Sequence, residues 1–143
     1  MSLATMSGLE ILHAMAEGKI PPASITQTMP MKVISVEPGK VVFEATADER
    51  HLNPLGGVHG GFLATIMDSV TACAVHSSLE AGVGYATIDL NVKMLKPVPQ
   101  NIPLIAEGKL INLSKSLGIS EGCLKDEQGK LYGHATATCM ILR

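Results

Sequence analysis

The residues best suited to chemistry lie in a glycine-rich segment and in the helix expected after it. Residues 53–61 read Asn-Pro-Leu-Gly-Gly-Val-His-Gly-Gly, and a run of twenty residues without proline begins at Gly60. Unpaired backbone amides at a helix start lie at the positive end of the dipole, and glycine lets a ligand approach them closely. The Gly60 N–H could therefore stabilise an oxyanion, although glycines that only permit tight packing would give the same pattern.

A second candidate is Asp68, a carboxylate in a segment that is otherwise apolar or small. Aspartate is unfavourable in the middle of a helix, so its presence there needs a reason. The side chain is either exposed without a function or held in a cleft for acid–base chemistry. Small neighbours at helical spacing would leave room for a substrate or another backbone; they are Gly61, Ala64, Thr65, Thr71 and Ala72.

The spacing of these two candidates has a geometric consequence. Gly60 and Asp68 are eight residues apart, which is about 12 Å along a helix. A carbonyl oxygen bound by one group and the carbon attacked by the other would be neighbours, so one helix cannot supply both groups to one substrate. If both are catalytic, two antiparallel copies of the helix must meet, as a twofold dimer allows.

The composition limits the class of protein. The 143 residues are 46% hydrophobic and 17% charged, with a net charge of −2, two Tyr, two Phe and no Trp. We expect an aliphatic core and no nucleic-acid partner, because both surplus cations and stacking rings are missing. The longest apolar stretch, residues 62–75, is too short for a membrane span and contains Asp68. Part of the hydrophobic surplus is therefore expected in a subunit interface.

The cysteines indicate a reducing compartment. Cys73, Cys123 and Cys139 lie within apolar runs and lack CxxC spacing. They are interpreted as buried thiols, not as a disulfide framework or a zinc site, and no metal or redox cofactor is expected. Because the first residues lack the basic region of a secretory signal peptide, we expect a cytoplasmic protein.

Hydrophobic periodicity predicts the elements that position these groups. Ser7 and Glu10 form a capping-box pattern that begins a short helix, which ends at Gly18. A hairpin is expected over 31–46 with a type II turn at 37–40, then a loop over 49–59 and the main helix over 60–79. Four strands should follow in antiparallel meander order, over about 87–94, 103–113, 117–125 and 130–142. One face of the first of these strands should carry Ile88, Leu90, Val92 and Met94.

These elements predict a single α+β domain over residues 1–143. An N-terminal helix and lead-in would occupy 1–27, and a core would occupy 28–142. Because no βαβ alternation, internal repeat or linker is present, we expect one antiparallel sheet packed on one buried helix.

The ordered motifs resemble the hotdog-fold acyl-CoA thioesterases, in particular the PaaI-like branch. The resemblance covers about residues 28–142 and depends on Asn53, His59-Gly60-Gly61, Asp68 and Thr87-Ile88-Asp89-Leu90-Asn91 followed by Pro97. It implies an antiparallel β-sheet wrapped around one long central helix, and a homodimer or a homotetramer built as a dimer of dimers. The implied activity is hydrolysis of an acyl-CoA thioester at a composite site between subunits. Coenzyme A enters only as part of the substrate, and no other cofactor is implied.

The resemblance also implies roles for individual residues. Gly60 and Asn53 correspond to the groups that bind the thioester carbonyl. Asp68 corresponds to an acid on the partner subunit's helix that attacks the carbon or activates water, and the Thr87 hydroxyl would assist it. His59 would position Asn53 or its loop, or would cap the helix.

Contacts to the substrate's coenzyme A are implied at three positions. The family often has Gly-Arg-Ser near the fourth strand, where this chain has Ser114-Lys115-Ser116. Lys115 and Ser116 are therefore candidates for a phosphate contact, with a solvated hairpin charge as the alternative. Gly61 is the third substrate-binding candidate, and His76 is expected to be structural.

Two alternatives stay open. A hydratase or dehydratase of the same fold uses an Asp and His pair in a loop of the type Asp-x-Asn-Pro-Leu-His, whereas residues 51–56 here read His-Leu-Asn-Pro-Leu-Gly. A non-catalytic acyl-CoA-binding or regulatory module is the second alternative, and the presence of Asp68 with Thr87 argues against it. The eight methionines favour a pliable aliphatic pocket for linear acyl groups, with arylacetyl esters still open.

Overall fold

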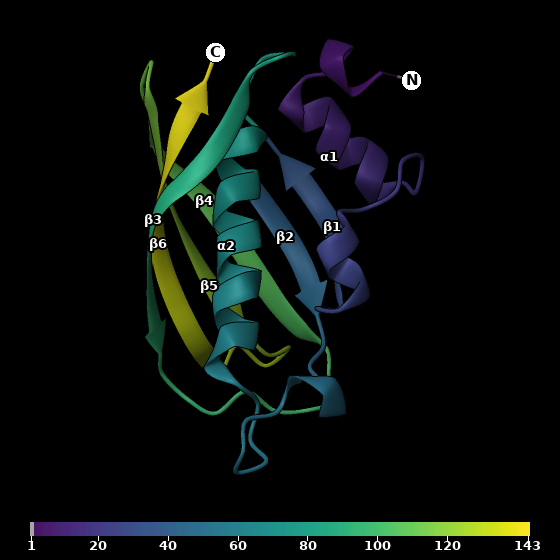
Figure 1. Cartoon of the computed structure of the whole chain (residues 1–143), viewed down its shortest axis with the longest axis vertical. Helices are drawn as coiled ribbons and strands as arrows, with labels where there is room; N and C mark the ends of the chain where they lie inside the picture. The colour runs from purple at the N-terminus through teal and green to yellow at the C-terminus, as the bar shows by residue number, and fades with distance from the viewer. Residues whose placement is uncertain (1) are drawn as a thin grey trace.

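A six-stranded antiparallel sheet curves around one long helix in the computed structural model, which describes residues 2–143 (Figure 1). The long helix is α2 (Gly60–His76), and a shorter helix, α1 (Gly8–Ala16), lies beside one edge of the sheet. The strands are β1 (Met31–Glu37), β2 (Lys40–Ala45), β3 (Gly84–Met94), β4 (Leu104–Leu113), β5 (Leu117–Lys125) and β6 (Leu131–Leu142). The expected α+β hotdog architecture, with its short N-terminal helix, is confirmed.

The strand order corrects one prediction. The order is β1-β2-β4-β5-β6-β3, so the expected meander holds for β4, β5 and β6, whereas β3 pairs with β6 and not with β4. Nine residues, Leu95 to Pro103, connect β3 to β4 and include three prolines, which do not form a tight hairpin. β3 is therefore an edge strand, and one row of its backbone groups is free to pair with another chain.

Glycines on the sheet allow α2 to approach it closely. A Cβ at Gly108 would overlap the main chain of Val70, and a Cβ at Gly133 would lie 2.6 Å from Leu63 Cδ1. The side chain of Thr71 is buried against this face, and its carbonyl accepts a hydrogen bond from Ser120 Oγ at 3.0 Å. Thr71 therefore does not share the open surface of Asp68, contrary to the expected stripe of small residues. The apolar residues of α2 that belong to the core are Phe62, Leu63, Ile66, Met67 and Val70.

The N-terminal helix docks on the far end of α2. Ser7 Oγ accepts the N–H of Glu10 at 3.2 Å, as the capping pattern predicts. The N–H of Gly8 donates to the carbonyl of Leu79 at 3.0 Å, and a Cβ at Gly8 would overlap the His76 carbonyl. This contact is possible because α2 ends at His76, three residues earlier than expected.

Ser77 explains this early end. Its Oγ donates to the carbonyl of Ala74 at 2.7 Å and accepts the N–H of Gly39 at 2.8 Å. The second bond ties the end of α2 to the turn between β1 and β2. Gly39 has a φ of 79°, which suits the third position of the expected type II turn, so the predicted hairpin is confirmed.

Three further properties concern the described residues alone. All three cysteines are free thiols. No group of three or more His, Cys, Asp or Glu side chains within residues 2–143 is arranged to hold a metal ion. In the same part of the chain, no helix has both the length and the apolar character needed to cross a membrane.

Candidate active site

A bulge in β3 determines which of its side chains face α2. The register of β3 against β6 shifts between Thr87 and Asp89, which makes Ile88 the extra residue. Ile88 is 54% exposed, so the expectation that it shares a face with Leu90 is wrong. The strict alternation predicted from sequence breaks at this point, because a bulge changes the direction of the side chains that follow it. As a result, Thr87 lies on the same side of the strand as Leu90 and faces the helix.

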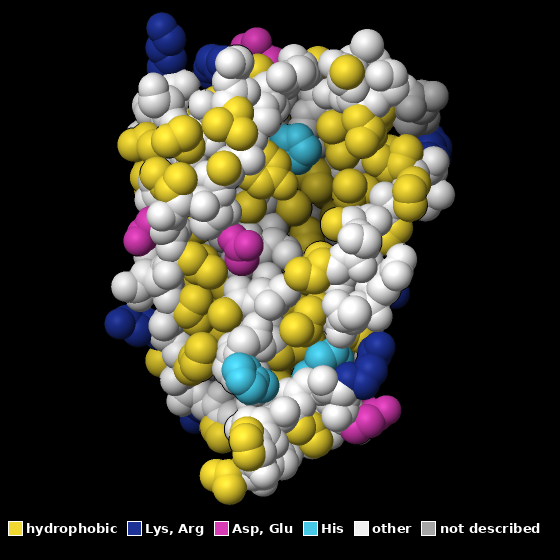
Figure 2. Space-filling model, viewed as in Figure 1, with side chains coloured by type: hydrophobic (Ala, Val, Ile, Leu, Met, Phe, Trp, Pro, Cys, Tyr) yellow, Lys and Arg dark blue, Asp and Glu magenta, His cyan; other side chains and the backbone are white. Residues whose placement is uncertain are grey.

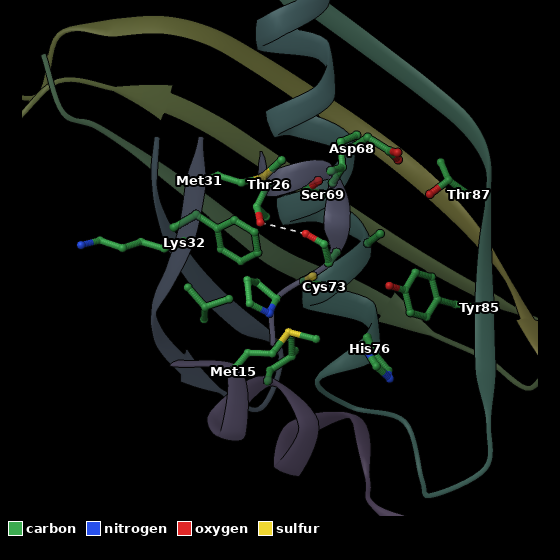
Figure 3. A pocket seen from close by; sticks show the side chains of 17 residues that line it. Met15, Thr26, Met31, Lys32, Asp68, Ser69, Cys73, His76, Tyr85 and Thr87 are labelled. Atoms are coloured by element: carbon green, nitrogen blue, oxygen red, sulfur yellow. Dashed lines mark hydrogen bonds between the residues drawn. The ribbon is translucent and has the colours of Figure 1, made fainter. Parts of the chain in front are cut away.

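A pocket of about 260 Å³ opens between α1, α2, β1 and β3 (Figure 3). We call it the Asp68 pocket. Figure 2 shows the hollow on this face of the molecule, lined by hydrophobic side chains. Asp68 and Thr87 both line the pocket, and their polar ends point toward one another (Figure 3). The apolar wall is formed by Leu12, Met15, Ile25, Met31, Val33 and Phe43.

The carboxylate of Asp68 is incompletely paired. Its Oδ1 is buried and has no hydrogen-bond partner within residues 2–143. A buried polar atom without a partner costs roughly 1–3 kcal/mol, so such an atom in a native protein calls for an explanation. The position in a pocket, opposite a hydroxyl, supplies one, because a bound reactant can satisfy this oxygen. Asp68 is thus placed in a cleft and is not an idle surface carboxylate.

The start of α2 forms a second surface, the helix-start groove. His59 is the N-cap, and its Nδ1 accepts the N–H of Gly61 at 2.7 Å. The N–H of Gly60 has no acceptor among the described residues. Gly60 lines a groove of about 260 Å³ together with Met94 and Lys96. A Cβ at Gly60 would lie 2.7 Å from Met94 Sδ, so only glycine fits there without a shift of Met94.

Asn53 organises the loop that leads into this groove. Its Oδ1 accepts the N–H of Leu55 at 2.9 Å and that of Gly57 at 3.2 Å. These bonds fix the orientation of the amide, and its NH₂ group has no acceptor within residues 2–143. No hydrogen bond joins His59 to Asn53 in the same part of the chain. The structure therefore shows His59 as a helix cap and Asn53 as an acceptor that holds its own loop.

The two surfaces are separate on one protomer. α2 is continuous from Gly60 to His76, so Gly60 and Asp68 lie about 12 Å apart along its axis. The Asp68 pocket and the helix-start groove have no lining residue in common. The structure thus brings Asp68 together with Thr87, and His59 together with Gly60, but does not join the two pairs.

The remaining substrate-binding candidates lie elsewhere. Lys115 and Ser116 occupy the exposed turn between β4 and β5 and line neither surface. The turn is held by the N–H of Ile141, which donates to the Ser116 carbonyl at 2.8 Å, and by Arg143 Nε, which donates to the Lys115 carbonyl at 3.2 Å. Gly61 lines neither surface, and its N–H already donates to His59 Nδ1.

Sequence reasoning missed several residues of the Asp68 pocket. His76 and Tyr85 line it, with ring centroids 4.9 Å apart. Burial lowers the pKa of His76 and raises the pKa of Tyr85. Burial also raises the pKa of Cys73 to about 12, so this lining thiol stays protonated. Tyr85 precedes Thr87 by two residues, which is a signal that could have identified it, whereas nothing in the spacing marks the wall formed by residues 22–26.

Comparisons with known proteins identify the family of the chain. The family model described as Thioesterase superfamily matches residues 55–132, more than half of the chain. Human acyl-coenzyme A thioesterase 13 is 27% identical over 107 residues, which cover 74% of this chain and 76% of that protein. The crystal structure of a phenylacetic acid degradation-related protein from Ralstonia eutropha JMP134 is 32% identical, with a TM-score of 0.81 over 90% of this chain and 98% of that one. Zebrafish thioesterase superfamily member 2 is 26% identical, with a TM-score of 0.74 over 98% of both chains. As the resemblance to hotdog-fold thioesterases predicts, the chain belongs to the thioesterase superfamily.

Proposed function

We propose that this protein hydrolyses an acyl-CoA thioester to the free acid and coenzyme A, at a site completed by two subunits. The observation that carries the proposal is the buried, unpaired Oδ1 of Asp68, which lies opposite Thr87 in an apolar pocket. Such a pocket can hold the acyl chain while the carboxylate meets the thioester carbon. The similarity to human acyl-coenzyme A thioesterase 13 supports an acyl-CoA substrate.

A twofold dimer would bring the two surfaces together. On α2 and β3 of one protomer, Asp68 lies level with Thr87, and Gly60 lies level with Met94. A twofold axis halfway between these two levels, near Leu90 on β3, would place the Gly60 level of one protomer beside the Asp68 level of its partner. Because β3 is an edge strand, two copies of it can pair antiparallel across this axis. Each Gly60 would then lie beside the partner subunit's Asp68.

Exposed apolar side chains mark the same edge. Ile88 and Met94 on β3 are 54% and 57% exposed, and Leu95 just after it is 51% exposed. Removing apolar surface from water stabilises an assembly by about 25 cal/mol per Å². We assign part of the hydrophobic surplus of the sequence to this interface. A second interface, which would make a dimer of dimers, stays part of the proposal.

The chemistry follows from the groups that would meet. The Gly60 N–H and the Asn53 NH₂ of one subunit bind the thioester oxygen and stabilise its charge in the tetrahedral state. The partner subunit's Asp68 attacks the carbonyl carbon, or takes a proton from a water that attacks it, with the Thr87 hydroxyl beside it. When the carboxylate attacks, the carbon–sulfur bond breaks to leave an acyl anhydride on Asp68, and water then hydrolyses it to the free acid and restores the carboxylate. When water attacks, the carbon–sulfur bond breaks to give the free acid directly. In both routes a proton from the water passes to the sulfur, and coenzyme A leaves as the thiol. Coenzyme A is the only group needed besides water, and three free thiols suit a reducing, cytoplasmic location.

The hydratase alternative receives no support from the loop. His51 stands where that class has its reactive Asp, and its side chain is buried. Its Nδ1 accepts the N–H of Asp48 at 2.9 Å, and its Nε2 donates to the carbonyl of Thr28 at 2.6 Å. The position of the reactive His is taken by Gly56. The residue in the first position is structural, and the residue in the second has no side chain to transfer a proton.

Release of coenzyme A thiol from a panel of acyl-CoA esters tests the proposal. Asp68→Asn should lower turnover on the order of 10²-fold or more while the protein stays folded, because the positioned carboxylate is lost. Glu37→Gln is the matched control, since Glu37 is an exposed carboxylate on β1, at the opposite edge of the sheet from β3, and lines neither surface. Equal rates for the wild type and Asp68→Asn would remove Asp68 from the mechanism. No release from any ester would favour the non-catalytic binding module.

A further inference from the structure

We infer that Tyr85 and His76 form a specificity subsite in the Asp68 pocket, which binds a neutral hydrogen-bonding group, such as a hydroxyl, on the distal part of the acyl chain. The inference rests on the proposed function, because it assumes that the pocket holds an acyl group. It assigns a role to two residues that sequence reasoning left out or treated as structural.

The position of the two residues is the first argument. Tyr85 lies two residues before Thr87 on the same side of β3, about 6.6 Å along the strand. His76 lies two turns beyond Asp68 on α2. Figure 3 shows the Tyr85 hydroxyl pointing into the space beside the helix. An acyl chain that starts between Asp68 and Thr87 and extends along the pocket therefore passes these rings.

The second argument is that their polar atoms have no partner. The other tyrosine of the chain, Tyr132, donates its hydroxyl to Asp126 Oδ2 at 3.2 Å. Within residues 2–143 the Tyr85 hydroxyl and the His76 ring nitrogens have no hydrogen-bond partner, although the two rings are in contact. Among the described residues, Asp68 Oδ1 is the one side-chain nitrogen or oxygen atom that is both fully buried and unpaired, so the Tyr85 and His76 polar atoms are open to the pocket, where a ligand hydroxyl can replace water as their partner.

The charge of the pocket decides which polar group fits. Burial lowers the pKa of His76 and raises that of Tyr85, so both rings are neutral near pH 7. The cation that lines the pocket is Lys32, which is exposed and pairs with Glu44 at 3.7 Å. The anion that lines it is Asp68, which would repel a second carboxylate. A hydroxyl therefore suits the subsite, and a terminal carboxylate does not.

Three esters with the same carbon skeleton test the subsite: hexanoyl-CoA, 6-hydroxyhexanoyl-CoA and hexanedioyl-CoA. We expect kcat/KM to be about threefold to tenfold higher for the hydroxy ester than for the plain ester, as one added hydrogen bond allows, and lowest for the diacid. In Tyr85→Phe the ratio of hydroxy to plain ester should fall to about one, whereas Tyr132→Phe should keep the wild-type ratio. A wild-type ratio near one, or a ratio that Tyr85→Phe leaves intact, would overturn the inference.

A binding measurement separates this inference from the proposed function. The thioethers S-hexyl-CoA and S-(6-hydroxyhexyl)-CoA cannot be hydrolysed, so calorimetry reports the subsite whether or not the protein is an enzyme. Tighter binding of the hydroxy thioether by the wild type, lost in Tyr85→Phe, would support the subsite even if no ester is cleaved. Equal dissociation constants for the two thioethers would overturn the subsite even if every ester is cleaved.

Discussion

The helix-start groove and the Asp68 pocket are built by different kinds of interaction. The polar groups at the start of α2 are held by hydrogen bonds within one short segment: Asn53 holds its own loop, and His59 Nδ1 accepts the N–H of Gly61. The pocket depends on packing between segments far apart in the sequence, because α1, β1, α2 and β3 each supply part of its wall. The polar groups at the helix start are thus arranged locally, although residues 94–98 supply the other wall of the groove, whereas the Asp68 pocket is non-local throughout and largely apolar.

This difference separates two tasks of the proposed reaction. Stabilising an oxyanion needs donors in fixed positions, which a short hydrogen-bonded loop and a helix start provide. Holding an acyl chain needs apolar surface that can adjust, and methionine and leucine from several elements provide it. The two surfaces lie about two helical turns apart on one chain. Each subunit would therefore contribute its groove to one active site of the dimer and its Asp68 pocket to the other.

Mixing two inactive variants would test this division most strongly. Asp68→Asn disables the pocket in both sites of its homodimer, and Asn53→Ala disables the groove in both sites of its own. A mixed dimer has one site with both substitutions and one site with neither. Joint refolding of equal amounts should therefore restore about a quarter of the wild-type sites, measured as thiol release.

The control for this experiment uses two defects on the same surface. Asp68→Asn mixed with Thr87→Ala should give no recovery, because every site in the mixed dimer keeps one of the two defects. If Asp68→Asn with Asn53→Ala gives only the mean of the two parents, each site lies within one chain and the composite geometry is wrong.

Gly8→Ala should damage the pocket and spare the groove. The new Cβ would overlap the His76 carbonyl, so α1 must move away from α2. α1 carries Leu12 and Met15 of the pocket wall. We expect a loss of about 1–3 kcal/mol in the free energy of unfolding, together with a higher KM for the acyl ester. Denaturant titration and steady-state kinetics would measure the two effects.

Gly84→Ala is the matched control for this substitution. Its Cβ would meet Leu142 Cβ at 3.7 Å, which is an ordinary contact, and its backbone has no positive φ. If the two variants lose the same stability, α1 does not dock on α2 as described.

The fold was largely predictable from periodicity, with one exception. The hairpin, the main helix and the last three strands were expected within a few residues, because each is set by local alternation and turn residues. The neighbour of β3 could not be predicted in this way, since pairing depends on where a chain goes after it leaves the strand. The proline-containing connection of residues 95–103 leads from β3 to β4 without forming a hairpin. β3 therefore pairs with β6 and not with β4.

The sequence predicted the helix start of the candidate site better than it predicted the Asp68 pocket. Asn53, His59 and Gly60 lie within eight residues, and their arrangement follows from the loop and the helix start. Asp68 and Thr87 were identified by motif order, but the bulge at Ile88 that turns Thr87 inward left no mark in the sequence. The wall from residues 22–26 and the contact of His76 with Tyr85 arise only when distant segments pack together.

Removal of the His59 cap should have a smaller effect on stability, and that effect should be confined to the helix-start groove. His59→Ala should cost about 1 kcal/mol in the free energy of unfolding, because the N–H of Gly61 loses its acceptor. His59→Asn should restore both stability and turnover, since asparagine is a favourable N-cap residue. If stability recovers in the Asn variant but turnover does not, the imidazole has a role in catalysis beyond the cap.

The smallest effect is expected from substitution of two lysines. The two substitutions test whether the helix-start groove or the β4–β5 turn contacts the phosphates of coenzyme A. Lys96 lines the helix-start groove, whereas Lys115 lies in the exposed turn. We expect Lys96→Ala to raise KM for an acyl-CoA ester by about twofold to fivefold with little change in kcat, as for an exposed ion pair. The effect should shrink between about 0.02 M and about 0.5 M salt, because screening weakens such contacts. If Lys115→Ala raises KM and Lys96→Ala does not, the β4–β5 turn contacts the phosphates of coenzyme A, as the resemblance to the family implies.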